Sequence, residues 1–285
     1  MATGRNMRRA TRPASHSGFS LLEMVVVIAI TGIIGAMVAV FMARPVQSYT
    51  DSVQRAEYSD IADTALRRII RDLRLALPNS VRVAEVPAGS GIFYLEFLLT
   101  SGGGRYRAEK TGGGAGDPLD FTTADGSFDV IGPPLTFTGG ESIVIYNLGF
   151  TGADAYAGSN RAAYGGATGG AVSNIVFSGT KLFPLASPGN RFHVVQHAVT
   201  YKCDPVAGEI RRYWNYAIGA AQSTPPAGGS NAQLARNVSA CSITYDQNAI
   251  QGRNGIVTLR LTLSTGVGSP VVINLFQETH VSNVP

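Results

Sequence analysis

The feature that most constrains this chain is the short motif Gly18 to Glu23, together with the apolar segment that follows it. The run from Met24 to Ala43 carries no charged side chain over 20 residues, which is long enough to cross the hydrocarbon core of a bilayer as a helix. Glu23 stands just inside the N-terminal end of this segment, and a carboxylate at that depth is costly unless it has a partner. We therefore expect a membrane-spanning helix at residues 19–43 and a pairing partner for Glu23.

The residues before this segment form a basic leader. They contain Arg5, Arg8, Arg9 and Arg12 and no acidic residue, and the positive-inside rule places such a stretch in the cytoplasm. An ordinary secretory signal would have a shorter apolar core and an A-x-A-like cleavage site, and no such site follows Ala43. We therefore expect the helix to stay in the mature protein, with the rest of the chain across the membrane.

The leader also accounts for the formal net charge of +4. Removing its four arginines from the 23 lysines and arginines leaves 19, which equals the 19 aspartates and glutamates. The remaining chain is electrically neutral, so no nucleic-acid partner is expected.

Residues 44–78 predict an amphipathic helix that continues the apolar one. Pro45 predicts a kink, and Pro78-Asn79 predicts the end of the helix. The apolar side chains recur mostly at three- or four-residue steps, and we expect them to dock on a globular domain. They are Tyr49, Val53, Ala56, Ile61, Ala65, Ile69, Leu73 and Leu77.

A basic run within this helix has two interpretations. Its members are Arg67, Arg68, Arg71 and Arg74. They could form a functional patch, but the interpretation that we prefer is a solvated helix face on which the arginines pair with Asp63 and Asp72.

Residues 79–285 predict a β-rich globular head, in which β-like runs alternate with Gly-rich connections. The strand candidates are residues 81–86, 92–99, 143–148, 174–177, 192–202, 209–216, 238–245, 255–264 and 270–281. We expect one hairpin between 194–203 and 209–216, and a second across the turn at 265–270. The predicted fold class is α+β, a long N-terminal helix packed on an antiparallel sheet.

Two Gly-rich segments, 101–116 and 151–170, show no strand pattern. Loops of this length in a compact domain are usually functional surface or mobile. We interpret both as surface insertions of the head, with contact to a partner or ligand as the alternative. A shorter Pro- and Gly-rich loop covers residues 224–230.

Cys203 and Cys241 are the two cysteines of the chain. An even pair in an exported domain is typical of one disulfide. The alternative is two unrelated buried thiols.

Signals for catalysis are weak. His193 and His197 lie four residues apart on an expected strand and would share a face, but they belong to no H-E-x-x-H pattern and no nearby acid completes a metal set. The sequence contains neither a G-x-S-x-G nucleophile elbow nor a P-loop. We therefore expect no enzymatic activity.

Two further groups of side chains invite a ligand. The first is an acidic run, whose carboxylates could hold calcium or form a solvated loop: Asp117, Asp120, Asp125 and Asp129. The second could stack a sugar or a base, or simply pack: Trp214 with Tyr213, Tyr216 and Arg211. Apart from possible calcium, no cofactor is expected.

The N-terminal motif Gly18-Phe19-Ser20-Leu21-Leu22-Glu23 after a short basic leader resembles the class III signal of type IV pilins and of the pseudopilins of type II secretion. The resemblance implies that a prepilin peptidase removes residues 1–18 by cutting between Gly18 and Phe19 and that Phe19 is then methylated. It also implies a pilin fold and a helix that packs in a filament core with other major and minor pilins. Glu23 would be the fifth mature residue and, at assembly, would pair with the new α-ammonium of a neighbouring subunit.

Further resemblance lies in residues 200–204, 238–242, 257–263 and 278–285, which are similar to the MshO-type minor pilins of the mannose-sensitive haemagglutinin pilus. Residues 66–78 fit both this group and the J-type minor pseudopilins of type II secretion, which are the alternative within the family. The resemblance implies an inner-membrane precursor with a periplasmic head, an inner-membrane assembly platform as partner, and a final place in a cell-surface pilus. The alternatives from other classes are a membrane-tethered enzyme or sensor and a tip adhesin.

Overall fold

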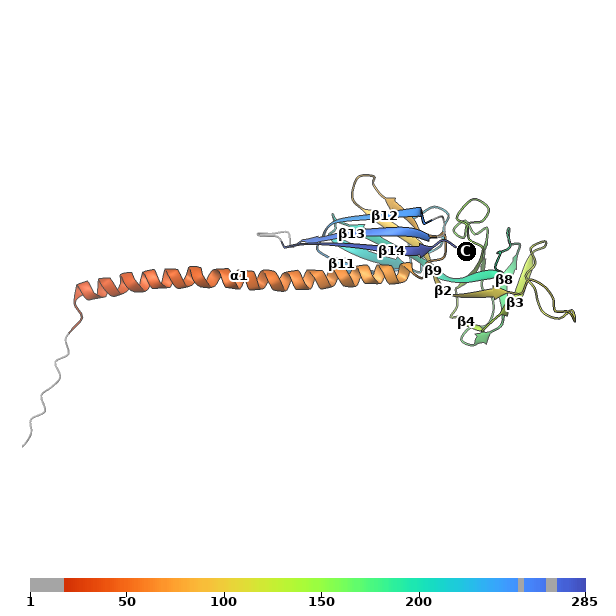
Figure 1. Ribbon diagram of the computed structural model, residues 1–285, viewed down its shortest axis with the longest axis horizontal. Helices are drawn as coiled ribbons and strands as arrows, with labels where there is room; N and C mark the ends of the chain where they lie inside the picture. The colour runs from red at the N-terminus through yellow and green to blue at the C-terminus, as the bar shows by residue number, and fades with distance from the viewer. Residues whose placement is uncertain (1–17, 251–253, 265–270) are drawn as a thin grey trace, which may run out of the picture. The chain divides into compact units, whose positions relative to one another are not determined.

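The computed structural model describes residues 18–250, 254–264 and 271–285, without the side chains of 43, 44 and 248–250. The predicted leader at 1–17 and the predicted turn at 265–270 lie outside these residues. The chain divides into one unit that runs to Val53 and a second unit, Gln54–Pro285. Helix α1 (Leu21–Leu73) contributes to both units (Figure 1).

The first unit consists, in its described part, of the apolar portion of α1. None of its described side chains from Gly18 to Val53 is buried. Pro45 lies inside α1 and does not end the helix, while its kink stays a prediction. Judged by length and composition alone, α1 is apolar enough to cross a membrane.

The second unit joins the end of α1 to antiparallel strands. In chain order these are β1 (Arg82–Glu85), β2 (Phe93–Tyr106), β3 (Asp125–Ile131), β4 (Leu135–Thr136), β5 (Ser142–Ile145), β6 (Arg161–Ala163), β7 (Ala171–Val172), β8 (Asn174–Lys181), β9 (Arg191–Asp204), β10 (Glu209–Trp214), β11 (Ser230–Arg236), β12 (Val238–Ile250), β13 (Asn254–Ser264) and β14 (Val272–Ser282). This arrangement of one long helix and antiparallel sheets confirms the α+β class and is consistent with a pilin fold.

The strands form one large sheet and two smaller ones. The large sheet has the order β11-β10-β9-β2-β3-β8, with β1 paired to β2 and with β5 placed between β9 and β6. The second sheet, β12-β13-β14, is seen with its strands side by side in Figure 1. The pairing of β9 with β10 confirms the first predicted hairpin. β13 pairs with β14 as expected, although their connecting turn is not described.

The C-terminal part of α1 docks on these sheets, but over a shorter stretch than predicted. Ala62, Ala65, Leu66, Ile69 and Leu73 are buried in one cluster with side chains of β2, β9 and β13. The predicted contact of Ala56 is wrong, because its side chain is exposed. Tyr49 and Val53 belong to the first unit, and their contacts stay predictions.

Helix α1 also ends earlier than Pro78-Asn79 predicted. Its last residue is Leu73, and the N–H of Leu77 donates instead to the carbonyl of Leu98 on β2, at 2.8 Å. An amide engaged by a strand cannot also serve the i to i−4 ladder of a helix. The stop is therefore set by a partner that is distant in the sequence.

The interpretation of 101–116 as a loop is wrong for its first third. Strand β2 continues to Tyr106, through Gly102, Gly103 and Gly104, and pairs with β9 along this stretch. A Cβ atom on Gly103 would lie 2.7 Å from the carbonyl oxygen of Phe192. The glycines mark a close approach between two strands, a recognised use of glycine in a strand interior.

The segment 151–170 is also less peripheral than predicted. It contains β6, which pairs with β5, and it buries Ala153, Ala155, Tyr156 and Asn160. Side chains of this segment complete a cluster with Leu98 and neighbouring residues. It is therefore part of the packed head rather than a surface insertion.

Candidate functional site

The candidate functional site is the N-terminal part of α1, and its first turn begins with a capping serine. The backbone N–H of Glu23 donates to Oγ of Ser20 at 3.2 Å, and the N–H of Met24 donates to the Ser20 carbonyl. Ser20 therefore caps the helix and occupies one of the amides that would otherwise lack a partner. With Glu23 three residues later, the sequence matches a capping box.

The carboxylate of Glu23 does not complete that box. Among the described residues, no hydrogen bond or ion pair reaches its side-chain oxygens, and the side chain is exposed. Its position in the first turn is favourable, because the helix dipole stabilises a negative charge there by about 0.3–1 kcal/mol. The carboxylate is thus held at a defined place on the helix and remains available to a partner.

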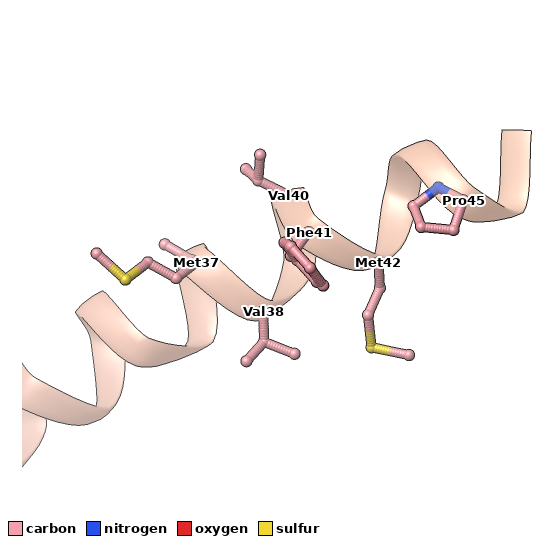
Figure 2. A pocket seen from close by; sticks show the side chains of 7 residues that line it. Met37, Val38, Val40, Phe41, Met42 and Pro45 are labelled. Carbon is pink, nitrogen blue, oxygen red and sulfur yellow. The ribbon is translucent and has the colours of Figure 1, made fainter. Parts of the chain in front are cut away.

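The apolar surface that follows surrounds the helix. Figure 2 shows the side chains of Met37, Val38, Phe41 and Met42 standing away from the ribbon on several sides. All four are at least 49% exposed. A helix that is apolar on every side requires a membrane or other helices around it, and no described part of this chain supplies either.

The small and polar residues of this apolar segment are also compatible with packing against other helices. A Cβ atom added to Gly32 or Gly35 would meet nothing within 4 Å, so no described neighbour requires glycine there. Glycine at such positions permits close packing between helices in a membrane. The hydroxyl of Thr31 donates to the carbonyl of Val27 at 2.7 Å, which satisfies it without a partner outside the helix.

A second carboxylate of α1 is satisfied within the chain. Asp72 is buried, and its Oδ2 accepts hydrogen bonds from Oη of Tyr201 at 2.7 Å and from Nε of Arg212 at 2.9 Å. Burial and the neighbouring Asp72 raise the pKa of Tyr201, so the phenol stays protonated as a donor. Both predicted pairs are present, Arg67 with Asp63 at 2.7 Å and Arg68 with Asp72 at 3.3 Å. The expectation that Asp72 lies on a solvated face is wrong, because its side chain is buried.

Cys203 and Cys241 are joined by a disulfide. Cys203 lies on β9 and Cys241 on β12, so the bond connects the large sheet to the three-stranded sheet. Cys203 is buried in the cluster that receives the end of α1. The bond therefore ties together the two surfaces between which the helix docks.

The remaining predicted groups do not assemble into a site. Among the described residues, no three His, Cys, Asp or Glu side chains are placed to hold a metal ion. Within the acidic run, Asp129 is engaged by Nε of Arg107 and by the N–H of Asp117. These interactions hold the pKa of Asp129 low, the backbone bond from Asp117 first.

The two histidines do not share a face, contrary to prediction. Gln196 has no partner in the register between β9 and β2 and forms a bulge, so Val195 and Ala198 pack in the same cluster. A bulge shifts the alternation of side chains between the two faces of a strand. The bulge at Gln196 therefore puts His193 and His197 on opposite faces of β9. The predicted aromatic group is likewise divided, because Arg211 pairs with Glu209 and it is Arg212 that stacks over Trp214.

Comparison with known proteins bears on the N-terminus alone. The prokaryotic N-terminal methylation motif matches residues 13–39. This match indicates a type IV pilin-like precursor. Neither the search of curated proteins nor the search of solved structures found a match for this chain.

Sequence reasoning missed two features of the molecule, of which only the first has a local signal. The capping box was visible as Ser20-x-x-Glu23, a recognised helix-start pattern. The burial of Asp72 had no local signal, because its partners Tyr201 and Arg212 lie more than a hundred residues away.

Proposed function

We propose that this chain is the precursor of a minor pilin of a type IV pilus of the mannose-sensitive haemagglutinin kind. Prepilin peptidase cuts between Gly18 and Phe19, and Phe19 is methylated. The observation that carries the proposal is the methylation motif at the start of a helix whose described apolar side chains are all exposed as far as Val53. A pilin meets both environments that suit such a surface, first the membrane and then the filament core.

The free carboxylate of Glu23 supports a role in assembly. Cleavage creates an α-ammonium on Phe19, and we propose that it pairs with the Glu23 carboxylate of a neighbouring subunit. In low dielectric the pairing offsets the cost of two isolated charges. The rival is a bond within one chain, from the Ser20 amide to Glu23, which would complete the capping box.

We infer the cellular location of the precursor from the same helix. The precursor spans the bacterial inner membrane once, with its head in the periplasm, and passes from the assembly platform into a filament on the cell surface. The 29.9 kDa chain is bulky for the repeating subunit of a thin filament. A low-copy position at the tip, or a role in priming assembly, suits that size.

Mass spectrometry of the mature N-terminus tests the processing step. We expect a chain that begins at Phe19 and carries one additional methyl group on its amine. Gly18→Ala should abolish cleavage, and Gly32→Ala, a matched change further along the helix, should leave it intact. Finding the uncleaved chain in wild-type cells would contradict the proposal.

The choice between pilus and secretion apparatus needs a separate experiment. Deletion of the gene should remove surface pili, or reduce their number, while secretion of folded proteins continues. If pili persist and secretion stops, the chain is instead a minor pseudopilin of type II secretion.

A further inference from the structure

The large sheet has a gap along one edge of β9. On that edge β10 ends where Trp214 pairs with Val199, and β5 begins where Ser142 pairs with Val195. The intervening residues 196–198 therefore have neither β5 nor β10 beside them. The gap coincides with the bulge at Gln196 on the β2 side, and bulges frequently redirect side chains next to functional sites.

A cleft of about 440 Å³ opens at this gap. This volume falls within the range of small-molecule binding sites. Polar side chains from four separate segments line it, namely Ser142, Arg161, Gln196, His197 and Asn215, together with the ring of Tyr216. Burial lowers the pKa of His197, which favours its neutral form. No carboxylate is among its described lining residues.

Both walls of the cleft are fixed by buried carboxylates that face other groups. Glu96 accepts hydrogen bonds from Tyr216 Oη at 3.0 Å and from Arg82 Nε at 2.8 Å. Arg82 in turn donates to the carbonyl of Ala220, which holds the segment after Tyr216. On the opposite wall Glu141 accepts from the N–H of Gly139 at 2.6 Å. A ligand would meet a preformed surface and would incur little ordering cost.

Arg161 is an arginine of this cleft whose guanidinium makes no direct hydrogen bond or ion pair among the described residues. Burial lowers its pKa, and the charge of Asp154, which lies beyond ion-pair distance, offsets only part of that effect. The neighbouring Lys181 is committed to the carbonyl of Gly158 at 2.7 Å. A guanidinium presents donors in a planar fork that matches a carboxylate, and leaving it partly desolvated and unpaired is unfavourable.

The geometry points to this cleft as a binding site for an acidic saccharide, whose carboxylate pairs with Arg161 while its hydroxyls bond to Gln196, Asn215 and Ser142. One available cation suits a singly charged carboxylate better than a doubly charged phosphate. Amide and hydroxyl side chains both donate and accept, as sugar hydroxyls do. The inference does not depend on the proposed function, since binding requires neither cleavage nor a filament.

The test is calorimetric titration of the purified full chain in detergent with two probes that share one sugar ring and differ at its carboxyl group. These are methyl galactosiduronic acid, which carries one carboxylate, and its methyl ester, which is uncharged. We expect the acid to bind at least tenfold more tightly than the ester. Equal affinity for the two probes, or no binding of either, would overturn the inference.

Three variants locate the site. Arg161→Gln should weaken binding of the acid at least tenfold, and Arg105→Gln, which changes an exposed arginine outside the cleft, should leave it unchanged. Gln196→Asp adds a negative charge at an exposed position, so folding should be preserved while the acid binds more weakly and the ester does not. Acid binding that is indifferent to both cleft variants would place the saccharide elsewhere and refute the assignment.

Discussion

Two of the carboxylates on helix α1, Glu23 and Asp72, lie in opposite environments. Glu23, in the first turn, is exposed and lacks a partner among the described residues, whereas Asp72, in the last turns, is buried between Tyr201 and Arg212. The apolar side chains around them differ in the same way, being exposed in the first unit and buried at the end of the helix. The C-terminal part of α1 finds its partners within the chain, and the N-terminal part must find them elsewhere.

Removal of Asp72 should have the largest effect on folding. Asp72→Ala leaves Arg212 partly buried without its counter-ion, and breaking a buried pair in this way typically costs about 3–5 kcal/mol. The measurement is denaturant unfolding of the full chain in detergent.

Asp63→Ala is the matched control on the same helix. Asp63 pairs with Arg67 at the surface, where solvent screens the two charges, so its removal should lower the free energy of unfolding far less than removal of Asp72. Equal losses in the two variants would show that the buried network does not anchor the helix.

Loss of the disulfide should lower the free energy of unfolding by a similar amount. Replacing Cys203 and Cys241 with serine removes a constraint across 38 residues, which contributes about 4 kcal/mol in the chain-entropy description. The same unfolding experiment measures it, with the reduced wild-type chain as reference. A double variant as stable as the oxidised protein would mean that docking of α1 does not depend on the bond.

A smaller effect, and on a different property, is expected at Glu23. Glu23→Gln removes the charge with little change in shape, so the free energy of unfolding of the head should stay constant while incorporation into filaments falls about tenfold, which corresponds to about 1.4 kcal/mol. Quantitative blotting of sheared filaments against the membrane fraction measures it.

Glu57→Gln provides the control for that substitution. Glu57 is an exposed glutamate on the same helix, 3.7 Å from Arg236, and its change should leave incorporation intact. If Glu23→Gln also assembles normally, pairing between subunits is not what its carboxylate provides.

The sequence predicted those parts of the fold that have a local signal. The strand candidate at residues 255–264, in which Leu259, Leu261 and Leu263 alternate with polar residues, corresponds to β13, and the 20-residue uncharged run corresponds to the apolar part of α1. The failures lie where a distant partner decides the outcome. Gly102 to Gly104 form a strand because β9 lies against them, although glycine is depleted in strands.

The two candidate sites differ in the same way, because one has a local signal in the sequence and the other depends on distant segments. Gly18, Phe19 and Glu23 belong to one contiguous motif and could be assigned directly. The cleft at Arg161 draws its side chains from four separate segments and exists only where β10 gives way to β5 along β9. No local pattern could have predicted that juxtaposition.

The smallest effect is expected at Ser20, which separates the cap of α1 from the charge of Glu23. Ser20→Ala removes the acceptor of the Glu23 amide, and loss of such a cap typically costs about 1 kcal/mol. Amide hydrogen exchange in detergent should therefore become about fivefold faster in the first turn and stay unchanged near Asp72. Ser20→Asp, which retains an acceptor, should restore slow exchange. If Ser20→Ala instead abolished filament incorporation as strongly as Glu23→Gln, the Glu23 carboxylate would depend on the cap for its placement, and the two roles would not be separable.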